Sequence, residues 1–304
     1  MRAAGYISLA AACVAMLMFT ACKKSEGVYA SKKKIACIYT AKEGWYTNLD
    51  PNDSTFSKKY YQTSKYKSEN WEWEKRKPSR ITYYNPDGIK SGEEQFTYKS
   101  GKVVMKTDRT NSSKAEFTYN DKMLESVHWY VDGAVYAISK FTHDGKQMRE
   151  IKTSVFSMNT GKSGCCPLLS KAYDRKNKAD AAGIVYSERL VITWETDNIS
   201  HIECYDDDSE TPIATWTFTY DTKSNPLRNF WTKREYYGSI LPHLGSMNNL
   251  LNEKIVTRDG KEYNYTYQYK YDGDYPTECV RSHNEGEEGN YPRQEVVTMT
   301  YNYE

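Results

Sequence analysis

Two short aromatic segments hold the side chains whose pattern best fits ligand binding. In Trp71-Glu72-Trp73-Glu74, a strand would place both indoles on one face and both carboxylates on the other, because successive side chains point to opposite sides. Trp129, within His128-Trp129-Tyr130, has the same character. Exposed indoles stack on sugar rings, whereas buried indoles fill a core, which is the more common arrangement. Trp71, Trp73 and Trp129 are therefore the candidate ligand-binding residues, with core packing as the alternative.

Cys22 stands where the sequence predicts a covalent modification. Arg2 is the only charged residue before Cys22, and small residues occupy the last two positions before the cysteine. A charged start, an apolar middle and a small-residue exit form a secretory signal. The cysteine at the exit makes this signal similar to that of bacterial lipoproteins, whose new N-terminal cysteine carries anchoring acyl chains. We expect residues 1–21 to be a removed signal peptide, with an uncleaved transmembrane anchor as the alternative.

The segment after Cys22 bears on location. We expect residues 22–34 to be a flexible tether and the membrane to be reached through the acyl chains alone. Surface-exported lipoproteins of Bacteroidota often carry an acidic run after the cysteine, whereas this chain has Lys23-Lys24-Ser25-Glu26. This difference favours a lipid-anchored protein of the outer membrane that faces the periplasm rather than the cell surface.

No local pattern predicts catalysis, a metal ion or a cofactor. The five histidines are scattered, and the sequence has no nucleophile elbow. The acidic run Asp206-Asp207-Asp208-Ser209-Glu210 lacks the spacing of a calcium loop, and Cys165-Cys166 has no second pair at zinc-ligand spacing. No catalytic residue, metal ligand or cofactor is predicted. Hydrolysis by paired carboxylates stays open, because 40 Asp and Glu residues do not reveal which two face each other.

Charge and cysteine content narrow the choice of partner and compartment. Lys and Arg number 42 against 40 Asp and Glu, so no net field draws the chain to nucleic acid. Beyond Cys22 the cysteines are odd in number, and at least one must be free or pair between chains in an oxidising compartment. These cysteines are Cys37, Cys165, Cys166, Cys204 and Cys279.

The elements that would carry these residues are β-strands. Tyrosine is unusually frequent, with 28 residues against 8 Phe, and it favours a pleated, half-buried surface. A weak repeat of aromatic–Thr–aromatic followed by a turn recurs along the chain, and its turns have the residues of tight hairpins. Its units are Phe96-Thr97-Tyr98, Phe117-Thr118-Tyr119, Phe141-Thr142-His143 and Phe218-Thr219-Tyr220.

Consecutive hairpins predict an all-β fold: a large antiparallel up-and-down meander that forms a curved, barrel-like sheet. It would occupy residues 35–304 as a single domain. We expect strands at Ile35–Thr40, Val127–Val131, Val135–Phe141, Ile184–Trp194, Ile199–Tyr205, Tyr263–Tyr271 and Val296–Tyr303. Between Tyr236 and Leu251 the apolar spacing is helical, and glycines and Pro242 limit it to one or two short turns covering an end or edge of the sheet.

The C-terminal half resembles a family of Bacteroidota lipoproteins defined by a domain of unknown function with a porin-like fold. The likeness is clearest over residues 215–280, where Phe218-Thr219-Tyr220-Asp221, Asn225-Pro226-Leu227 and Tyr269-Lys270-Tyr271-Asp272-Gly273 occur in the family's order. The hairpins also faintly resemble tyrosine–aspartate repeat proteins. The family implies a barrel-like sheet on a lipid tether and no catalytic residues.

Together these observations favour a non-enzymatic, lipid-anchored envelope protein that binds or scaffolds. Its partner would be a glycan, an apolar molecule or an envelope protein. The alternative is a hydrolase acting on polysaccharide or peptidoglycan. The strands have Tyr, Thr, Lys and Glu where a bilayer-spanning barrel needs aliphatic residues, so we expect the sheet to stand outside the membrane.

Overall fold

The computed structural model describes residues 26, 29, 32–49, 56–108, 110, 112–156, 184–206, 209–233, 238–285 and 294–304. These residues form one antiparallel sheet and a short helix, α3 (Leu241–Gly245). The strands are β1 (Ile35–Leu49), β2 (Phe56–Gln62), β3 (Tyr66–Glu74), β4 (Lys77–Tyr84), β5 (Lys90–Lys99), β6 (Lys102–Asp108), β7 (Ser113–Asn120), β8 (Met123–Val131), β9 (Ala134–Asp144), β10 (Gln147–Phe156), β11 (Ile184–Glu195), β12 (Asn198–Asp206), β13 (Ala214–Ser224), β14 (Asn248–Thr257), β15 (Glu262–Asp272), β16 (Tyr275–Glu285) and β17 (Gln294–Tyr303).

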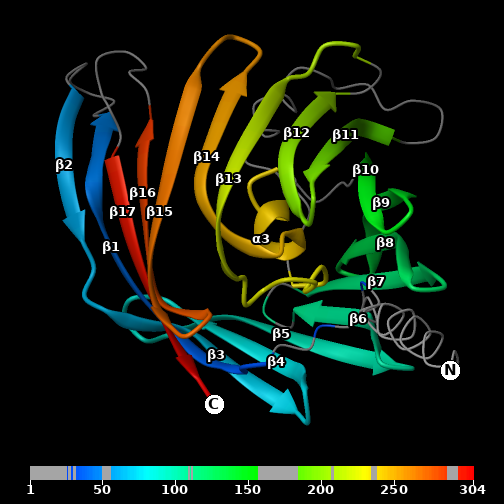
Figure 1. Cartoon of the computed structure of the whole chain (residues 1–304), viewed down its shortest axis with the longest axis horizontal. Coiled ribbons are helices and arrows are strands. Elements are labelled where there is room, and N and C mark those ends of the chain that lie inside the picture. Colours follow the sequence, from blue (N-terminus) through cyan, green and yellow to red (C-terminus); the bar gives the residue numbers. More distant parts are fainter. Residues whose placement is uncertain are drawn as a thin grey trace, which may run out of the picture.

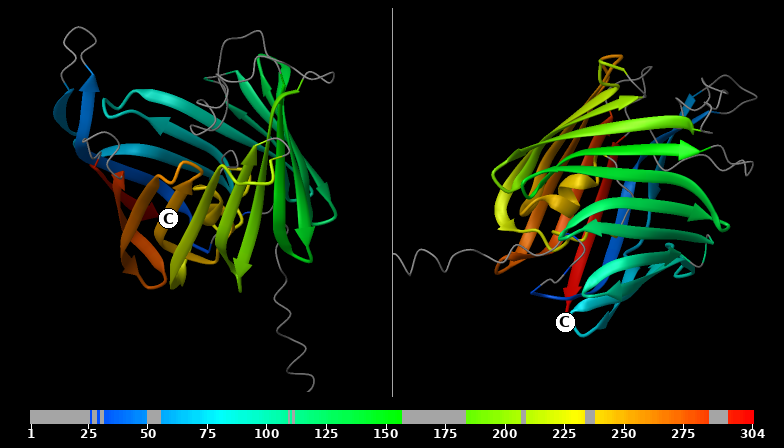
Figure 2. Two further views of the ribbon diagram at one scale, coloured as in Figure 1. Left: turned by 90° about the horizontal axis from the view of Figure 1, so that it is seen from above. Right: turned by 90° about the vertical axis from the view of Figure 1, so that its right-hand side faces the viewer.

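The sheet closes into a barrel. Each strand from β3 to β17 pairs with the next, and β1 closes the ring by pairing with β17 on one side and β3 on the other. The far half of β1 pairs with β2, so β2 and β3 share one place and the 17 strands fill 16 positions. The predicted all-β meander is thus confirmed, and closure removes the exposed strand edges that an open sheet would leave. The hairpins follow one another around the barrel (Figure 2).

The inner and outer walls differ in chemistry. On β15 the tyrosines at alternate positions face inward, with Tyr267 buried, while Asn264, Gln268 and Lys270 are exposed on the outside. The same alternation on β3 puts Trp71 and Trp73 inside and Glu72 and Glu74 outside. On these two strands the inward positions are mainly aromatic and the outward positions polar, the reverse of the pattern in a water-filled barrel that spans a membrane.

The barrel is filled by the segment between β13 and β14, which we call the plug (residues 225–233 and 238–247). Figure 1 shows α3 inside the ring of strands. Leu241 and Leu244 of α3 and Phe230 before it have no exposed surface, and Trp231 keeps only 3%. A barrel of this many strands encloses more space than its own inward side chains fill, and the plug supplies the missing apolar volume.

Glu26, Tyr29 and Lys32–Lys34, the described residues before β1, lie at one end of this filled barrel. Tyr29 stacks on Phe230 of the plug at 4.4 Å between ring centroids and donates its hydroxyl to the Pro226 carbonyl at 2.6 Å. Lys33 pairs with Asp272 at 2.7 Å. We call Glu26, Tyr29 and Lys32–Lys34 the basal strap. The expectation of a flexible tether over residues 22–34 does not hold at Glu26 and Tyr29, whose exposed fractions are 8% and 2%.

The same end of the barrel, the basal rim, is formed by the turns that join β3–β4, β5–β6, β7–β8, β9–β10, β11–β12 and β15–β16. Here aromatic side chains join each hairpin to the next. The β6–β7 ladder ends at Met105 and Glu116, and Tyr119 then donates its hydroxyl to the Val103 carbonyl at 2.7 Å. Corresponding bonds run from Trp73 to Ile35, Tyr98 to Pro78, Trp194 to Met148, Tyr220 to Ile199 and Tyr303 to Pro276.

These bonds explain the repeat in the sequence. The register shifts by one residue next to each strand-end aromatic of the β3–β4, β5–β6, β7–β8 and β11–β12 hairpins. Such a bulge swings the side chain along the rim and interrupts the ladder. The phenol or indole then supplies the donor that the next carbonyl would otherwise lack. The aromatic–Thr–aromatic unit is thus the sequence form of one repeated rim contact.

The junction of β8 and β9 is built differently. His143 stands where the other units have tyrosine or tryptophan, and its Nε2 lies 3.1 Å from the Glu26 carboxylate. Glu26 also accepts a hydrogen bond from the Leu124 amide at 2.6 Å, and its own amide donates to the Lys122 carbonyl at 3.1 Å. The basal strap therefore completes the one rim junction whose repeat unit ends in histidine.

The expected strands are confirmed, with bounds that are longer in the structure. The expectation of one or two short helical turns between Tyr236 and Leu251 is confirmed by α3, after which Asn248 begins β14. The helix lies inside the barrel, however, rather than at an edge. Its buried leucines, together with Phe230 and Trp231, make the segment apolar on more than one side, and only the lumen can bury it. Residues 1–21, Cys22 and the Cys165-Cys166 pair lie outside the described residues.

The rim bonds give a stability prediction. Tyr98→Phe and Tyr119→Phe should each lower the free energy of unfolding by about 1–3 kcal/mol. Each variant loses the hydroxyl donor, while the carbonyl that accepted its hydrogen bond stays in place without a partner. Urea unfolding followed by tryptophan fluorescence measures the effect. Tyr130→Phe is the matched control, since Tyr130 donates to Glu116 on the outer wall and water can replace that bond. Equal losses of unfolding free energy in all three variants would show that the rim bonds stabilise the fold no more than a bond on the outer wall.

Candidate functional site

The structure places Trp71 and Trp129 in the core and Trp73, partly buried, against it. Trp71 is 3% exposed and Trp129 5%, and Trp73 lies close to Tyr29 of the basal strap. Each indole has an internal partner: Trp71 donates to Glu69 at 2.8 Å, Trp73 to the Ile35 carbonyl at 2.8 Å and Trp129 to Ser139 at 3.1 Å. Trp71 also packs against Phe230 of the plug, Trp73 against Tyr29 of the basal strap, and Trp129 against Phe117. The core alternative is therefore the arrangement that these contacts describe.

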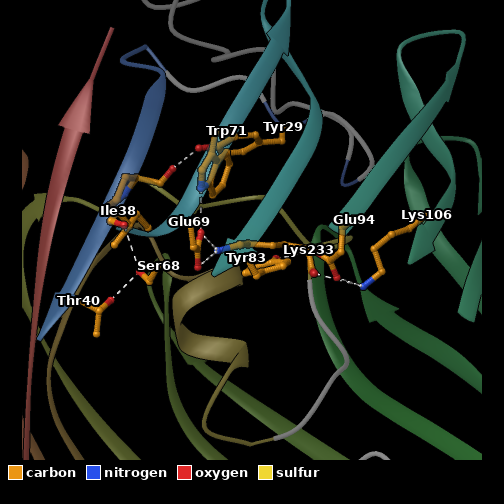
Figure 3. A network of polar contacts seen from close by, with 11 residues as sticks. Tyr29, Ile38, Thr40, Ser68, Glu69, Trp71, Tyr83, Glu94, Lys106 and Lys233 are labelled. Atoms are coloured by element: carbon orange, nitrogen blue, oxygen red, sulfur yellow. Dashed lines mark hydrogen bonds and ion pairs between the residues drawn. The ribbon is translucent and has the colours of Figure 1, made fainter. Parts of the chain in front are cut away.

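Beside Trp71, buried ion pairs hold the plug to the barrel wall (Figure 3). The Lys233 ammonium, 2% exposed, lies 3.0 Å from the Glu69 carboxylate and over the Trp71 ring. Lys106 pairs with Glu94 at 2.9 Å and donates to the Lys233 carbonyl at 3.2 Å. Each charge has an opposite partner, as burial requires. This network fixes the plug and leaves no group free for chemistry.

A second polar group, the inner-wall cluster, lies on the other side of the barrel. It runs along directly paired positions, which share one face of an antiparallel sheet. Glu253 of β14 is opposite Tyr265, Tyr265 is opposite His283, and His283 is opposite Glu295. Tyr267 and Arg281 form the neighbouring pair. Strand pairing alone thus brings together two carboxylates, an arginine, a histidine and two tyrosines.

Glu295 is the centre of one half of the cluster. Arg281 donates to it at 2.9 Å, and Tyr61 of β2 donates at 2.6 Å by reaching across β1. Gly44 makes this reach possible: a Cβ there would lie 3.2 Å from the Tyr61 ring and 2.4 Å from a backbone oxygen. Burial alone would raise the pKa of Glu295, but the Tyr61 hydroxyl and the Arg281 charge bring that pKa below its ordinary value.

Glu253, in the other half, has the opposite electrostatics. Its side chain is 2% exposed, and burial raises its pKa to about 7, although the Ser239 and Tyr267 hydroxyls work against that rise. Tyr267 lies 3.2 Å from Oε2, while the buried Oε1 has no hydrogen-bond partner among the described residues. The buried Nε of Arg281 is likewise unpartnered within the described chain. An unmet acceptor and an unmet donor thus share one cluster.

The cluster is accessible in part. The side chains of Arg281 and Glu295 keep 34% and 19% of their surface, and Tyr265 is half-buried beneath the Arg281 guanidinium. On the plug side, the His243 ring of α3 meets Tyr267 edge-on at 5.6 Å. Carboxylates, a guanidinium and aromatic faces in one place suit a ligand with hydroxyl groups and a flat apolar face.

Other candidate features carry less chemistry. On the outer wall, Glu72, Arg80 and Gln95 help to line an open depression of about 440 Å³, where Arg80 already pairs with Glu72. Among the described residues no three His, Cys, Asp or Glu side chains gather as a metal site would require. The described cysteines Cys37, Cys204 and Cys279 are buried and unbridged. No helix in the described part of the chain is long and apolar enough to cross a membrane.

Sequence reasoning missed the inner-wall cluster almost entirely. The alternation from Tyr263 to Tyr271 correctly predicted one tyrosine face. Nothing in the sequence linked that face to Arg281 or Glu295, because only the registers of β15–β16 and β16–β17 place these residues beside it. Glu253 looked like any of the other acidic residues. Its burial between Tyr267 and the plug distinguishes it.

Comparison with known proteins gives limited information. No protein-family model matches the chain, and no curated protein sequence matches it. Among solved structures, a porin-like protein from Bacteroides uniformis is similar, with 11% identity, a TM-score of 0.48, and coverage of 91% of this chain and 99% of that one. A LolA superfamily protein from Nitrosomonas europaea has 8% identity, a TM-score of 0.22 and coverage of 91% and 87%. At these scores neither similarity supports an inference about activity.

The raised pKa of Glu253 predicts a specific pH dependence of stability. Its ordinary value is 4.5 and its folded value about 7, so the protonated form stabilises the fold. That contribution is complete below about pH 4.5 and is lost as the pH rises through 7, by up to about 3 kcal/mol. Glu253→Gln should remove this part of the fall in unfolding free energy with rising pH. Urea unfolding at several values between pH 4 and pH 8 measures it.

Burial also raises the pKa of Glu188 to about 7. The unfolding free energy of Glu253→Gln should therefore still fall with rising pH by the part that Glu188 contributes. Glu125→Gln changes an exposed side chain of the outer wall and is the matched control. A slope that is the same in Glu253→Gln and in the parent protein would contradict the assignment.

Proposed function

We propose that this protein is a lipid-anchored barrel of the bacterial envelope that binds a hydroxyl-rich ligand, most simply a glycan, at the inner-wall cluster. The observation that carries the proposal is a pair of buried atoms, Oε1 of Glu253 and Nε of Arg281, that have no hydrogen-bond partner among the described residues, with the Arg281 guanidinium over the Tyr265 ring. Buried polar atoms are normally satisfied, and exceptions concentrate where a ligand or water completes the bonding. The binding would be non-enzymatic.

The barrel's two ends support a direction of access. The plug and the basal strap fill the basal end, where Leu241, Phe230 and Tyr29 are almost fully buried. Partly exposed members of the cluster, Arg281 and Glu295, lie on the half of their strands away from that end. A ligand would therefore enter from the rim opposite the basal one.

The location proposed for the protein is the periplasmic face of the outer membrane, with the acyl chains of Cys22 as its hold on the bilayer. The polar outer wall supports a barrel that stands in water, because exposed Thr, Asn, Gln and Lys side chains are costly in hydrocarbon. The family of Bacteroidota lipoproteins with a porin-like domain of unknown function fits the same arrangement.

Hydrolysis of a polysaccharide or peptidoglycan is the second candidate, and one observation favours it. The pKa of Glu253 is raised and that of Glu295 lowered, the division of roles that an acid and a base need. Their strands are three spacings apart, so roughly 14 Å separates the backbones, a wide setting for paired carboxylates. Turnover lost in Glu253→Gln with ligand binding retained would establish this candidate.

Arg281→Ala should weaken glycan binding about tenfold or more, because charge-assisted hydrogen bonds contribute 1.5–3 kcal/mol. Isothermal calorimetry against a broad oligosaccharide panel is the measurement. Arg189→Ala is the matched control: Arg189 is 33% exposed, also pairs with a carboxylate and also covers a tyrosine ring, but it belongs to the outer wall. Parent protein that binds no glycan, or equal losses in both variants, would refute the proposed site.

Cys22→Ala should abolish firm membrane association, because two or more acyl chains anchor a protein that one chain or none cannot hold. Fractionation of cell envelopes after a high-salt wash measures it. Mass spectrometry of the parent protein should show a mature N-terminus at Cys22 with attached acyl groups. A Cys22→Ala protein that still sediments with washed membranes would overturn the anchor.

A further inference from the structure

We infer that the basal rim is a membrane-facing surface that binds anionic phospholipid headgroups. The inference rests on the proposed acylation of Cys22 and adds to it a protein surface, an orientation and a lipid preference. Three observations carry it: the position of Glu26, the charge of the turns around Glu26, and the pairing of the acidic residues on the rest of the rim.

Glu26 limits how far the basal rim can stand from the bilayer. Its amide and carboxylate are bonded to Lys122, Leu124 and His143 at the ends of the β7–β8 and β9–β10 hairpins. Only four residue steps separate Glu26 from Cys22. Even a fully extended chain covers at most about 3.5 Å per residue, so the acylated cysteine lies within about 14 Å of this rim.

The turns around Glu26 are rich in positive charge. We call the turns after β3, β5, β7 and β9 (residues 74–77, 99–102, 120–123 and 144–147) the basic arc. It has seven basic residues against three acidic ones, Glu74, Asp121 and Asp144, an excess of four positive charges. The basic residues are Lys75, Arg76, Lys77, Lys99, Lys102, Lys122 and Lys146.

The distribution of partners shows which charges face outward. Lys75, Arg76, Lys99 and Lys146 are exposed, and none has a carboxylate partner within the described chain. The turns after β11 and β15, on the rest of the rim, hold four acidic residues. Asp197, Asp272 and Asp274 are paired, with Arg228, Lys33 and Lys223, while Glu195 is exposed and has no ion pair among the described residues. The rim therefore presents the basic arc to solvent and neutralises most of the acidic turn residues elsewhere.

The magnitudes favour contact with an anionic surface. Each Lys or Arg near such a surface adds to the attraction, which fades over a Debye length of about 8 Å at physiological salt. The short link to Cys22 keeps the turns bonded to Glu26 within about two such lengths of the acylated cysteine. Contact would tilt the barrel onto β3–β10 and direct the opposite rim, with the proposed ligand entrance, away from the bilayer.

The test uses the acylated protein in nanodiscs of phosphatidylcholine alone or mixed with phosphatidylglycerol. The mass of the acylated protein and its co-migration with the disc are measured first. A protein that lacks acyl chains or leaves the disc would then contradict the proposed anchor, not the inference about the basal rim. Lysine acetylation is then followed by mass spectrometry. At low salt, Lys122 and Lys146 should react about threefold or more slowly on anionic discs, whereas Lys254 on the outer wall should not change. High salt should remove the difference.

Two charge-reversal variants complete the test. K75E/R76E/K99E should abolish the protection of Lys122 and Lys146 without releasing the protein from the disc. K67E/K140E/K152E makes the same charge change at exposed outer-wall positions and should keep the protection. Equal reaction rates on both lipid compositions, equal slowing of Lys254, or loss of protection in the control variant would overturn the inference. The scaffold protein of the discs is the same at both lipid compositions, so contact with a protein cannot produce a difference between them.

Discussion

At the basal rim, carbonyl groups just beyond the end of each inter-hairpin ladder need a donor, and the rest of the barrel depends on how that need is met. A phenol or indole from the neighbouring hairpin supplies it at six junctions, from Trp73 with Ile35 round to Tyr303 with Pro276. Each bond ties a local hairpin to the one beside it. These bonds extend, at the rim, the contact between hairpins that the backbone ladders make along the strands.

Closure creates the second constraint, which is the volume inside. Inward aromatic side chains do not fill a ring of 16 positions, and an apolar lumen that admitted water would destabilise the fold. The plug fills it with Phe230, Trp231, Leu241 and Leu244 and is held by the buried Lys233–Glu69 pair. Tyr29 covers the plug, so the basal strap is part of the core.

The filling is uneven, and this asymmetry is what the proposed functions have in common. Apolar residues such as Phe230 and Leu241 are fully buried at the basal end. The inner wall farther along β14–β17 holds Glu253, Arg281 and Glu295, and Oε1 of Glu253 and Nε of Arg281 have no hydrogen-bond partner in the part of the chain that the structure describes. The two proposals use this asymmetry: the basal rim would face the membrane, and the opposite rim would admit the ligand. The buried carboxyl of Glu253 weakens the fold as pH rises, a cost of the kind that binding sites often carry.

The sequence by itself determined the strands, the all-β meander and the alternation that puts tyrosines on one face, because period-two patterns and turn residues act over neighbouring positions. It also predicted the signal-like segment before Cys22. Three matters were decided only by tertiary structure: closure through β1 and β17, the plug's place in the lumen, and the cluster around Arg281. Each depends on pairing between strands far apart in the chain. His143 in place of a rim tyrosine was visible in the sequence, but its meaning required the position of Glu26, more than a hundred residues away.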